Sequence, residues 1–277
     1  MEMKKLLICM VAGMLLLPPV LAEFQVRTGE RATYESFQDN KSQGKAISCV
    51  EGRYKIENVV TRRFSMTAEA GGRVCGYLDS NGKPVRLEIY SPNSTKADMT
   101  VAFSGNAATI TYTLPASLQT TTPQQAENQS VTVNITSNTY DSTFYRQSIR
   151  YLPIKVGYTK NFQLFDPTIA ILMPGSSSMN ATLKITGREK ITVGNFTYDC
   201  YKGTIRTEIP QFLQSMMQML GQQPITEQTT SVWLRVSDLL LVREYSSISM
   251  PVLDPQTNTT QTKTTTTETR LVALSYA

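Results

Sequence analysis

The chain has 277 residues, of which 40% are hydrophobic, 18% charged and 8% aromatic. This composition is typical of a globular protein and excludes a disordered or collagen-like chain. The sequence contains no histidine, which excludes His-containing catalytic triads, histidine general bases and histidine metal ligands. The formal net charge is +5, and no run of Lys and Arg is longer than two residues. Because a nucleic-acid surface requires a denser basic patch, we expect no nucleic-acid partner.

Residues 1–22 have the features of a cleaved secretory signal peptide. Two lysines precede an apolar stretch at 6–17, two prolines end that stretch, and Val20-Leu21-Ala22 has the small-x-small pattern of a cleavage site. The alternative is an uncleaved anchor helix, but the apolar stretch is shorter than the ~20 residues that a spanning helix needs. We therefore expect a mature chain, 23–277, that is soluble and periplasmic or secreted.

Three cysteines lie beyond this leader, and an oxidising compartment favours their pairing. Cys49 and Cys75 each lie in a strand-like segment, and we predict a disulfide between them, which leaves Cys200 as a buried thiol. The alternative is that all three are small core residues, since free cysteines are often buried. No CxxC pair occurs, so we expect no metal site.

The dominant pattern is an alternation of apolar and polar residues, broken by short turn sequences such as Gly71-Gly72, Asn81-Gly82 and Gly105-Asn106. Such pairs permit the positive φ of two-residue hairpin loops. Strands joined this tightly can only be antiparallel neighbours, because parallel pairing needs a long crossover. The pattern therefore predicts an antiparallel meander with strands at 64–70, 73–78, 84–90, 99–103 and 110–114.

The second half of the chain repeats this pattern, so the fold class that we predict is all-β with minor helix. Threonine suits strands, which favours a terminal strand at 264–274, with a loop at 254–262. No change in composition divides the chain, so 23–277 is predicted to be one domain. The strands expected in this half are 131–135, 157–165, 181–185, 191–193, 196–200, 232–236 and 239–245, with a turn at Gly194-Asn195.

Two segments have helical spacing instead. In the first, Asp141 is placed to cap a short helix that Pro153 ends, with Phe144, Tyr145, Ile149 and Leu152 on one face. The second is the Met-rich segment 210–221, which begins with proline and ends with glycine, as helices do. Its apolar residues, which fall mostly on one side, are Phe212, Leu213, Met216, Met217, Met219 and Leu220.

The order of motifs over 140–250 resembles a known family. It runs from Tyr140-Asp141 and Arg150-Tyr151-Leu152-Pro153 to Val232-Trp233-Leu234 and Leu241-Val242-Arg243-Glu244. The order is similar to that of exported bacterial proteins of unknown function that share the open β half-barrel of the LolA and LolB lipoprotein carriers. The resemblance implies a strongly curved antiparallel sheet with one or two short helices on its concave face, where the carriers hold acyl chains. It implies no catalytic residue, and the Met-rich segment is an insertion in the family's pattern.

These observations predict a periplasmic, non-enzymatic protein that binds a hydrophobic or lipid-like ligand in the concave face, without a cofactor. Methionine adapts to irregular apolar ligands, so the Met-rich helix is a candidate lid; the alternative is a helix packed onto the core. Trp233 lies either at the cavity mouth or at a contact between sheet and helix. The candidate ligand-binding residues are Phe144, Phe212, Leu213, Met216, Met217, Met219, Leu220 and Trp233.

Two other functions stay open. A structural or assembly factor of the cell envelope would bind protein partners through exposed sheet edges. A hydrolase of envelope glycans would need a pair of carboxylates, but nothing in the spacing brings together any two of Asp141, Asp199, Glu227, Asp238 and Glu244. We therefore predict no catalytic residue.

Overall fold

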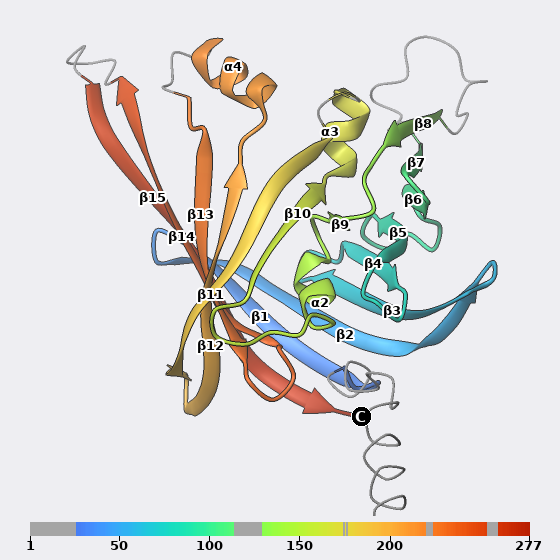
Figure 1. Ribbon diagram of the computed structural model, residues 1–277, viewed down its shortest axis with the longest axis horizontal. Coiled ribbons are helices and arrows are strands. Elements are labelled where there is room, and N and C mark those ends of the chain that lie inside the picture. The colour runs from blue at the N-terminus through green and yellow to red at the C-terminus, as the bar shows by residue number, and fades with distance from the viewer. Residues whose placement is uncertain (1–25, 114–128, 174, 176, 220–223, 254–259) are drawn as a thin grey trace, which may run out of the picture.

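The computed structural model describes residues 26–113, 129–173, 175, 177–219, 224–253 and 260–277. Their strands form one strongly curved sheet of 15 strands (Figure 1). The first half of the chain contributes β1 (Glu30–Gln38), β2 (Lys41–Ile56), β3 (Val59–Ala68), β4 (Arg73–Leu78), β5 (Pro84–Tyr90), β6 (Met99–Ser104), β7 (Ala107–Tyr112) and β8 (Gln129–Asn134). The second half contributes β9 (Thr139–Asp141), β10 (Thr159–Phe165), β11 (Ser178–Val193), β12 (Phe196–Glu208), β13 (Glu227–Arg235), β14 (Leu241–Leu253) and β15 (Thr260–Tyr276).

Each half of the chain is a meander, and pairing between β1 and β15 joins the two halves into one sheet. All neighbouring strands are antiparallel except β9 and β10, which pair in parallel at one edge. Gly71, Gly82, Gly105 and Gly194 have positive φ in the turns, as the turn sequences predict. The predicted fold class is confirmed: the sheet is curved, unclosed and almost wholly antiparallel, with a few short helices.

The alternation pattern does not predict three of the strands, and it divides a fourth. Neither β1 nor β2 was predicted, although they lie at the centre of the sheet, and the short edge strand β9 was not predicted either. Residues 181–185 and 191–193 belong to the single long strand β11, in which the register shifts between Ile185 and Gly187. A bulge adds one residue to a strand without ending it, which explains why the alternation breaks there while the strand continues.

The sheet ends at β8 on one side and at β9 on the other, although these two strands are consecutive in the chain. No described backbone hydrogen bond joins them, so side chains close the gap. Phe165 of β10 and Val133 of β8 belong to one buried cluster, together with Ala170 of the helix α3 (Pro167–Leu172). The rings of Phe103 and Phe165 meet edge to face across the gap at 5.7 Å between centroids.

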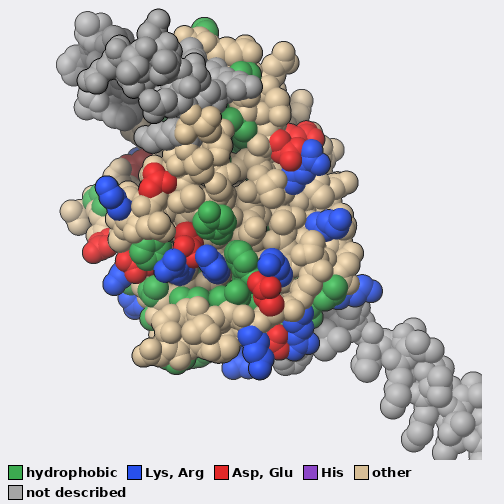
Figure 2. All heavy atoms as spheres, turned by 90° about the vertical axis from the view of Figure 1, so that its left-hand side faces the viewer, with side chains coloured by type: hydrophobic (Ala, Val, Ile, Leu, Met, Phe, Trp, Pro, Cys, Tyr) green, Lys and Arg blue, Asp and Glu red, His purple; other side chains and the backbone are tan. Residues whose placement is uncertain are grey.

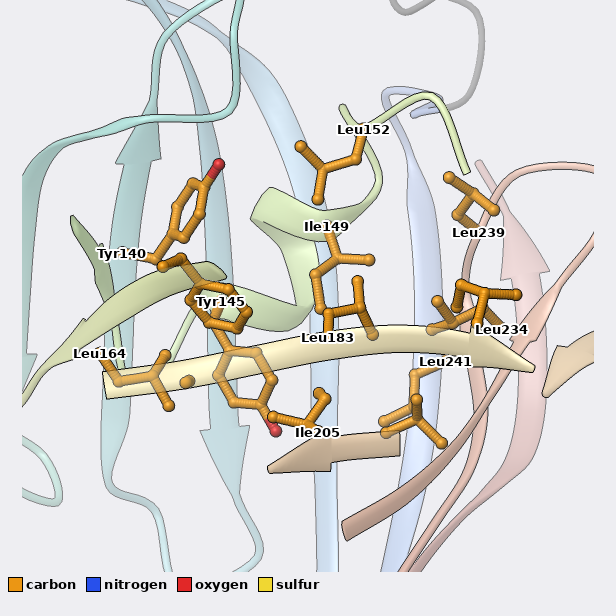
Figure 3. Packing of buried hydrophobic residues seen from close by; sticks show 14 residues of the cluster. Tyr140, Tyr145, Ile149, Leu152, Leu164, Leu183, Ile205, Leu234, Leu239 and Leu241 are labelled. Atoms are coloured by element: carbon orange, nitrogen blue, oxygen red, sulfur yellow. The ribbon is translucent and has the colours of Figure 1, made fainter. Parts of the chain in front are cut away.

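The helix α2 (Tyr145–Ile149) lies inside the curve of the sheet (Figure 1). Its residues Tyr145 and Ile149 point toward Leu183, Ile205 and Leu241, which come from β11, β12 and β14 (Figure 3). The helix is shorter than predicted and begins at Tyr145, and its N-cap residue Phe144 makes no side-chain cap hydrogen bond. The predicted α2 cap, Asp141, instead accepts hydrogen bonds from the backbone N–H groups of Thr143 and Phe144 in the preceding turn.

The other two helices occupy different places. In α3, which was not predicted, Asp166 caps the first turn by accepting from the N–H groups of Thr168 and Ile169, and Pro167 starts the helix. The predicted Met-rich helix is present as α4 (Gln211–Met219). It follows β12 and precedes β13, and it projects from that end of the sheet, away from α2 (Figure 1).

Figure 2 shows basic and acidic side chains interspersed with apolar ones on the face at the left of Figure 1. Within the described residues, no helix is long and apolar enough to cross a membrane.

The predicted disulfide between Cys49 and Cys75 is wrong, because both thiols are free. Cys49 in β2 and Cys75 in β4 both pair with Ser65 of β3, from opposite sides. Two strand spacings, about 9.5 Å, therefore separate their Cα atoms, whereas a disulfide requires less than about 7 Å. Cys200 is a buried free thiol, as expected.

Candidate functional site

A cavity of about 290 Å³ lies between α2 and the inner face of the sheet. We call it the α2 cavity. Its apolar lining comes from the central strands and from the start of α2, and consists of Tyr34, Ala46, Met66, Phe144, Leu240 and Leu241. Its polar lining is Ser36, Ser48, Thr143, Arg146, Gln147, Arg150 and Thr269. An apolar hollow with a few placed polar groups is the usual form of a small-molecule site.

A buried ion pair fixes the floor of the α2 cavity. Arg150, which is 1% exposed, follows α2 and donates to both carboxylate oxygens of Glu30 in β1, at 2.6 and 2.8 Å. Its Nε donates to the backbone oxygen of Asp238, and Gln147 of α2 donates to Ser48 of β2. Removing one partner of such a buried pair typically costs about 3–5 kcal/mol, so the position of α2 is strongly determined.

A second ion pair lies on the side of α2 that faces β14. Glu244 accepts from the Tyr145 hydroxyl at 2.8 Å and from Arg146 Nε at 2.6 Å. Arg146 Nη2 also contacts Glu244, at 2.5 Å. These contacts leave Arg146 Nη1 outside the ion pair, and the side chain is 36% exposed. The guanidinium thus keeps N–H groups for a further acceptor.

Tyr34 of β1 lines the cavity between these two ion pairs. Burial raises the pKa of its hydroxyl well above the usual value, although the charge of Arg150 acts in the opposite direction. The Tyr34 phenol is therefore neutral and can donate a hydrogen bond. Among the described residues, no side chain or backbone group forms a hydrogen bond with it.

The turn that leads into α2 contains a buried carboxylate. Asp141 is 2% exposed, and its Oδ2 has no hydrogen-bond partner among the described residues. Burial raises the pKa of Asp141 to about 7, two backbone N–H groups lower it, and the nearby charge of Asp166 raises it. This carboxyl group therefore gains and loses its proton near neutral pH.

The structure separates the predicted ligand-binding residues. Phe144 lines the α2 cavity, whereas none of the described α4 side chains does. Phe212, Leu213 and Met217 are partly buried and Met219 is 79% exposed; the side chain of Met216 and the whole of Leu220 lie outside the described residues. The described side chains of the Met-rich segment thus do not line the α2 cavity.

Trp233 also lies away from the cavity. It alternates with Val232 and Leu234, which pack toward α2, and so its ring faces the opposite side of β13. There its Nε1 donates to Glu189 at 2.5 Å, while Lys202 and Arg243 lie over the ring. These contacts bury the indole on the outer face of the sheet.

The sequence did not reveal Tyr34 and Arg150, which line the cavity, or Glu30, the ion-pair partner of Arg150. Tyr34 and Glu30 lie in the missed strand β1, where they alternate with Arg31 and Thr33 on the other face. That alternation after Gly29 was the available signal. Arg150 was noted only as part of a motif, and nothing in the spacing indicates its partner, which lies 120 positions away.

Four of the five candidate carboxylates are paired with arginines, in separate places. Glu227 pairs with Arg206, Asp199 with Arg188, Asp238 with Arg235 and Glu244 with Arg146. The fifth, Asp141, lies near Asp166, which caps α3. Within the described residues, no three metal-ligating side chains of His, Cys, Asp or Glu are grouped.

The sequence matches the family described as "Protein of unknown function (DUF3108)" over residues 50–252. The chain belongs to this family. The match confirms the resemblance seen over 140–250 and extends it to include most of the first meander. No curated protein matches the sequence.

Several solved structures are similar in part. One is described as an exported protein with a YmcC-like fold from Bacteroides fragilis, with 11% identity, coverage of 90% of this chain and 96% of that chain, and a TM-score of 0.33. Another is the hypothetical lipoprotein YmcC from Escherichia coli, with 7% identity, coverage of 93% and 91%, and a TM-score of 0.35. A third is an outer membrane lipoprotein-sorting protein domain from Vibrio parahaemolyticus, with 11% identity, coverage of 92% and 89%, and a TM-score of 0.17.

Proposed function

We propose that this DUF3108 protein binds a hydrophobic or lipid-like ligand in the α2 cavity, without catalysing a reaction. The observation that supports the proposal best is the cavity itself: about 290 Å³ between a firmly anchored helix and the inner face of the sheet. Exposing apolar walls to water costs about 25 cal/mol for each Å². An apolar ligand that covers Ala46, Met66, Phe144 and Leu240 recovers this free energy.

The wall of the cavity suits a ligand of variable shape. Met66 is unbranched and adapts to irregular apolar surfaces, while Ala46 leaves room above β2. The ion pairs of Arg150 with Glu30 and of Arg146 with Glu244 hold α2 in place over the cavity. Such preorganisation lowers the entropic cost of binding.

A periplasmic or otherwise exported location belongs to the same proposal. The leader at 1–22 supports it. The absence of a reaction is proposed because four of the five candidate carboxylates are engaged by arginines at separate places.

The test is to purify the processed protein from its native compartment, extract it with organic solvent and identify lipids by mass spectrometry. Binding of a fluorescent acyl probe is then measured for the delipidated wild type and for Ala46→Phe. An aromatic side chain suits a strand, and at this position it fills the cavity. We expect a stoichiometric lipid in the wild type and at least a tenfold loss of probe affinity in the variant.

Ala273→Phe is the matched control, because Ala273 is exposed on β15 and does not line the cavity. It should bind the probe like the wild type. If the wild type carries no lipid and binds no probe, the proposal is wrong, and protein partners of an envelope assembly factor become the next ligands to test.

A further inference from the structure

Polar and apolar residues line both sides of the α2 cavity. At the β14 and β15 side lie Thr269, Leu240, Leu241 and the Arg146–Glu244 ion pair, and Glu244 is the register partner of Thr269. At the other side, Met66 of β3 lies beside its register partner Ser48, and Phe144 packs over Gly76 of β4 so closely that a Cβ there would lie 2.6 Å from its ring. A ligand that spans the cavity can thus place a polar head beside Arg146 and apolar atoms beside Met66 and Phe144.

The β14 and β15 side of the cavity offers hydrogen-bond donors. Arg146 Nη1 is outside the ion pair with Glu244, and the neutral Tyr34 hydroxyl has no partner among the described residues. The Glu244 carboxylate is already engaged by Tyr145 and Arg146. Because a guanidinium cannot accept a hydrogen bond, the group that fits here is an acceptor, and an anionic acceptor forms the stronger, charge-assisted bonds.

We infer that the ligand is an amphiphile with an anionic head group, a carboxylate or phosphate. Its head lies against Arg146 and Tyr34, and its tail runs along Ala46 toward Met66 and Phe144. The inference rests on the proposed function, because it assigns the chemistry of the ligand in the same cavity. The N–H groups of Arg146 that lie outside its ion pair and the Tyr34 hydroxyl, which has no partner among the described residues, support it, since both line the same cavity.

The experiment measures, by titration calorimetry below the micellar concentration, the affinity of the delipidated full chain for three probes. Dodecanoate, dodecyl phosphate and dodecanol share one tail and differ in the head group. We expect at least one anionic probe to bind about tenfold or more tightly than dodecanol, as one charge-assisted hydrogen bond would give. The comparison of dodecanoate with dodecyl phosphate distinguishes a fatty-acid head from a phosphate head.

Two variants locate the head group. Arg146→Gln should lower the affinity for the anionic probe about tenfold and leave that for dodecanol unchanged. Tyr34→Phe removes a hydroxyl that has no described partner to lose, so it should keep the thermal stability of the wild type and weaken the anionic probe severalfold. Arg188→Gln is the matched control, since Arg188 pairs with Asp199 on the exposed surface and should change no affinity.

The outcomes are distinguishable. Equal binding of dodecanol and both anions, or a preference for anions that survives Arg146→Gln and Tyr34→Phe, would overturn the inference and leave the proposed function in place. If none of the three probes binds the wild type, the proposed function itself fails. If Arg146→Gln does not fold, the Tyr34→Phe comparison decides alone.

Discussion

At the scale of single residues, the most unusual group is the Asp141 carboxyl, buried in the turn that leads into α2. Its pKa is about 7 in the folded protein, against about 3.9 in an unfolded chain. The folded state therefore holds a proton between these values that the unfolded state has lost. The contribution of Asp141 to the free energy of unfolding is therefore greatest below about pH 4 and falls as the pH rises toward 7. Above pH 7 this contribution is constant.

We expect Asp141→Asn to abolish this pH dependence. The amide oxygen can still accept from the N–H groups of Thr143 and Phe144, while the uncompensated charge is gone. At pH 8 the variant should be more stable than the wild type, by up to about 4 kcal/mol, and at pH 4 the two should be similar. Urea unfolding at both pH values measures this difference. Parallel stability profiles of the two proteins would show that Asp141 is ionised without penalty.

At the scale of elements, the order of the strands decides which cysteines can react together. Because β3 lies between Cys49 and Cys75, we expect neither to be oxidised to a disulfide with the other. Alkylation of the denatured, unreduced protein should add three adducts over residues 26–277, with the same mass after prior reduction. A single adduct before reduction and three after it would contradict the strand order.

The sequence pattern of α4 predicts that the segment is helical, but it does not predict where the helix lies in the fold. Replacing Gln211–Met219 by a Gly/Ser linker of equal length should leave the unfolding midpoint and the affinity for an acyl probe nearly unchanged. The reason is that α4 projects beyond the sheet and Met219 is largely exposed. Calorimetry and probe titration measure both quantities. A large loss of probe affinity at unchanged stability would show that α4 closes over the ligand after all.

The sequence predicts local structure here better than it predicts the site, for physical reasons. Alternation and turn residues determine structure over only a few positions. The bounds of the two strands in the hairpin Arg73–Leu78 and Pro84–Tyr90 were therefore predicted correctly. The α2 cavity depends on contacts such as Arg150 with Glu30, which join distant parts of the chain. Phe144 was found because it lies on a helical face; Tyr34 was not, because its strand was not recognised.

At the scale of the whole molecule, the two ends of the sheet are held together by side chains. Phe165 is fully buried at this junction, and we expect Phe165→Ala to lower the free energy of unfolding by about 3–5 kcal/mol. Phe196→Ala is the control, since Phe196 is 62% exposed at a hairpin turn and should cost less than about 0.5 kcal/mol. Urea denaturation measures both. Equal, small effects would mean that the junction contributes little to stability.

The junction between β8 and β9 also determines how far the space inside the curved sheet can widen. A closed barrel has a girth fixed by its strand number and stagger, and it cannot widen without breaking hydrogen bonds between strands. Among the described residues, no backbone hydrogen bond joins β8 to β9, and apolar side chains bridge the gap. A small sliding movement at Phe103 and Phe165 would therefore change the girth without breaking any ladder of hydrogen bonds. The interior would then accommodate ligand chains of different width at the loss of a few van der Waals contacts.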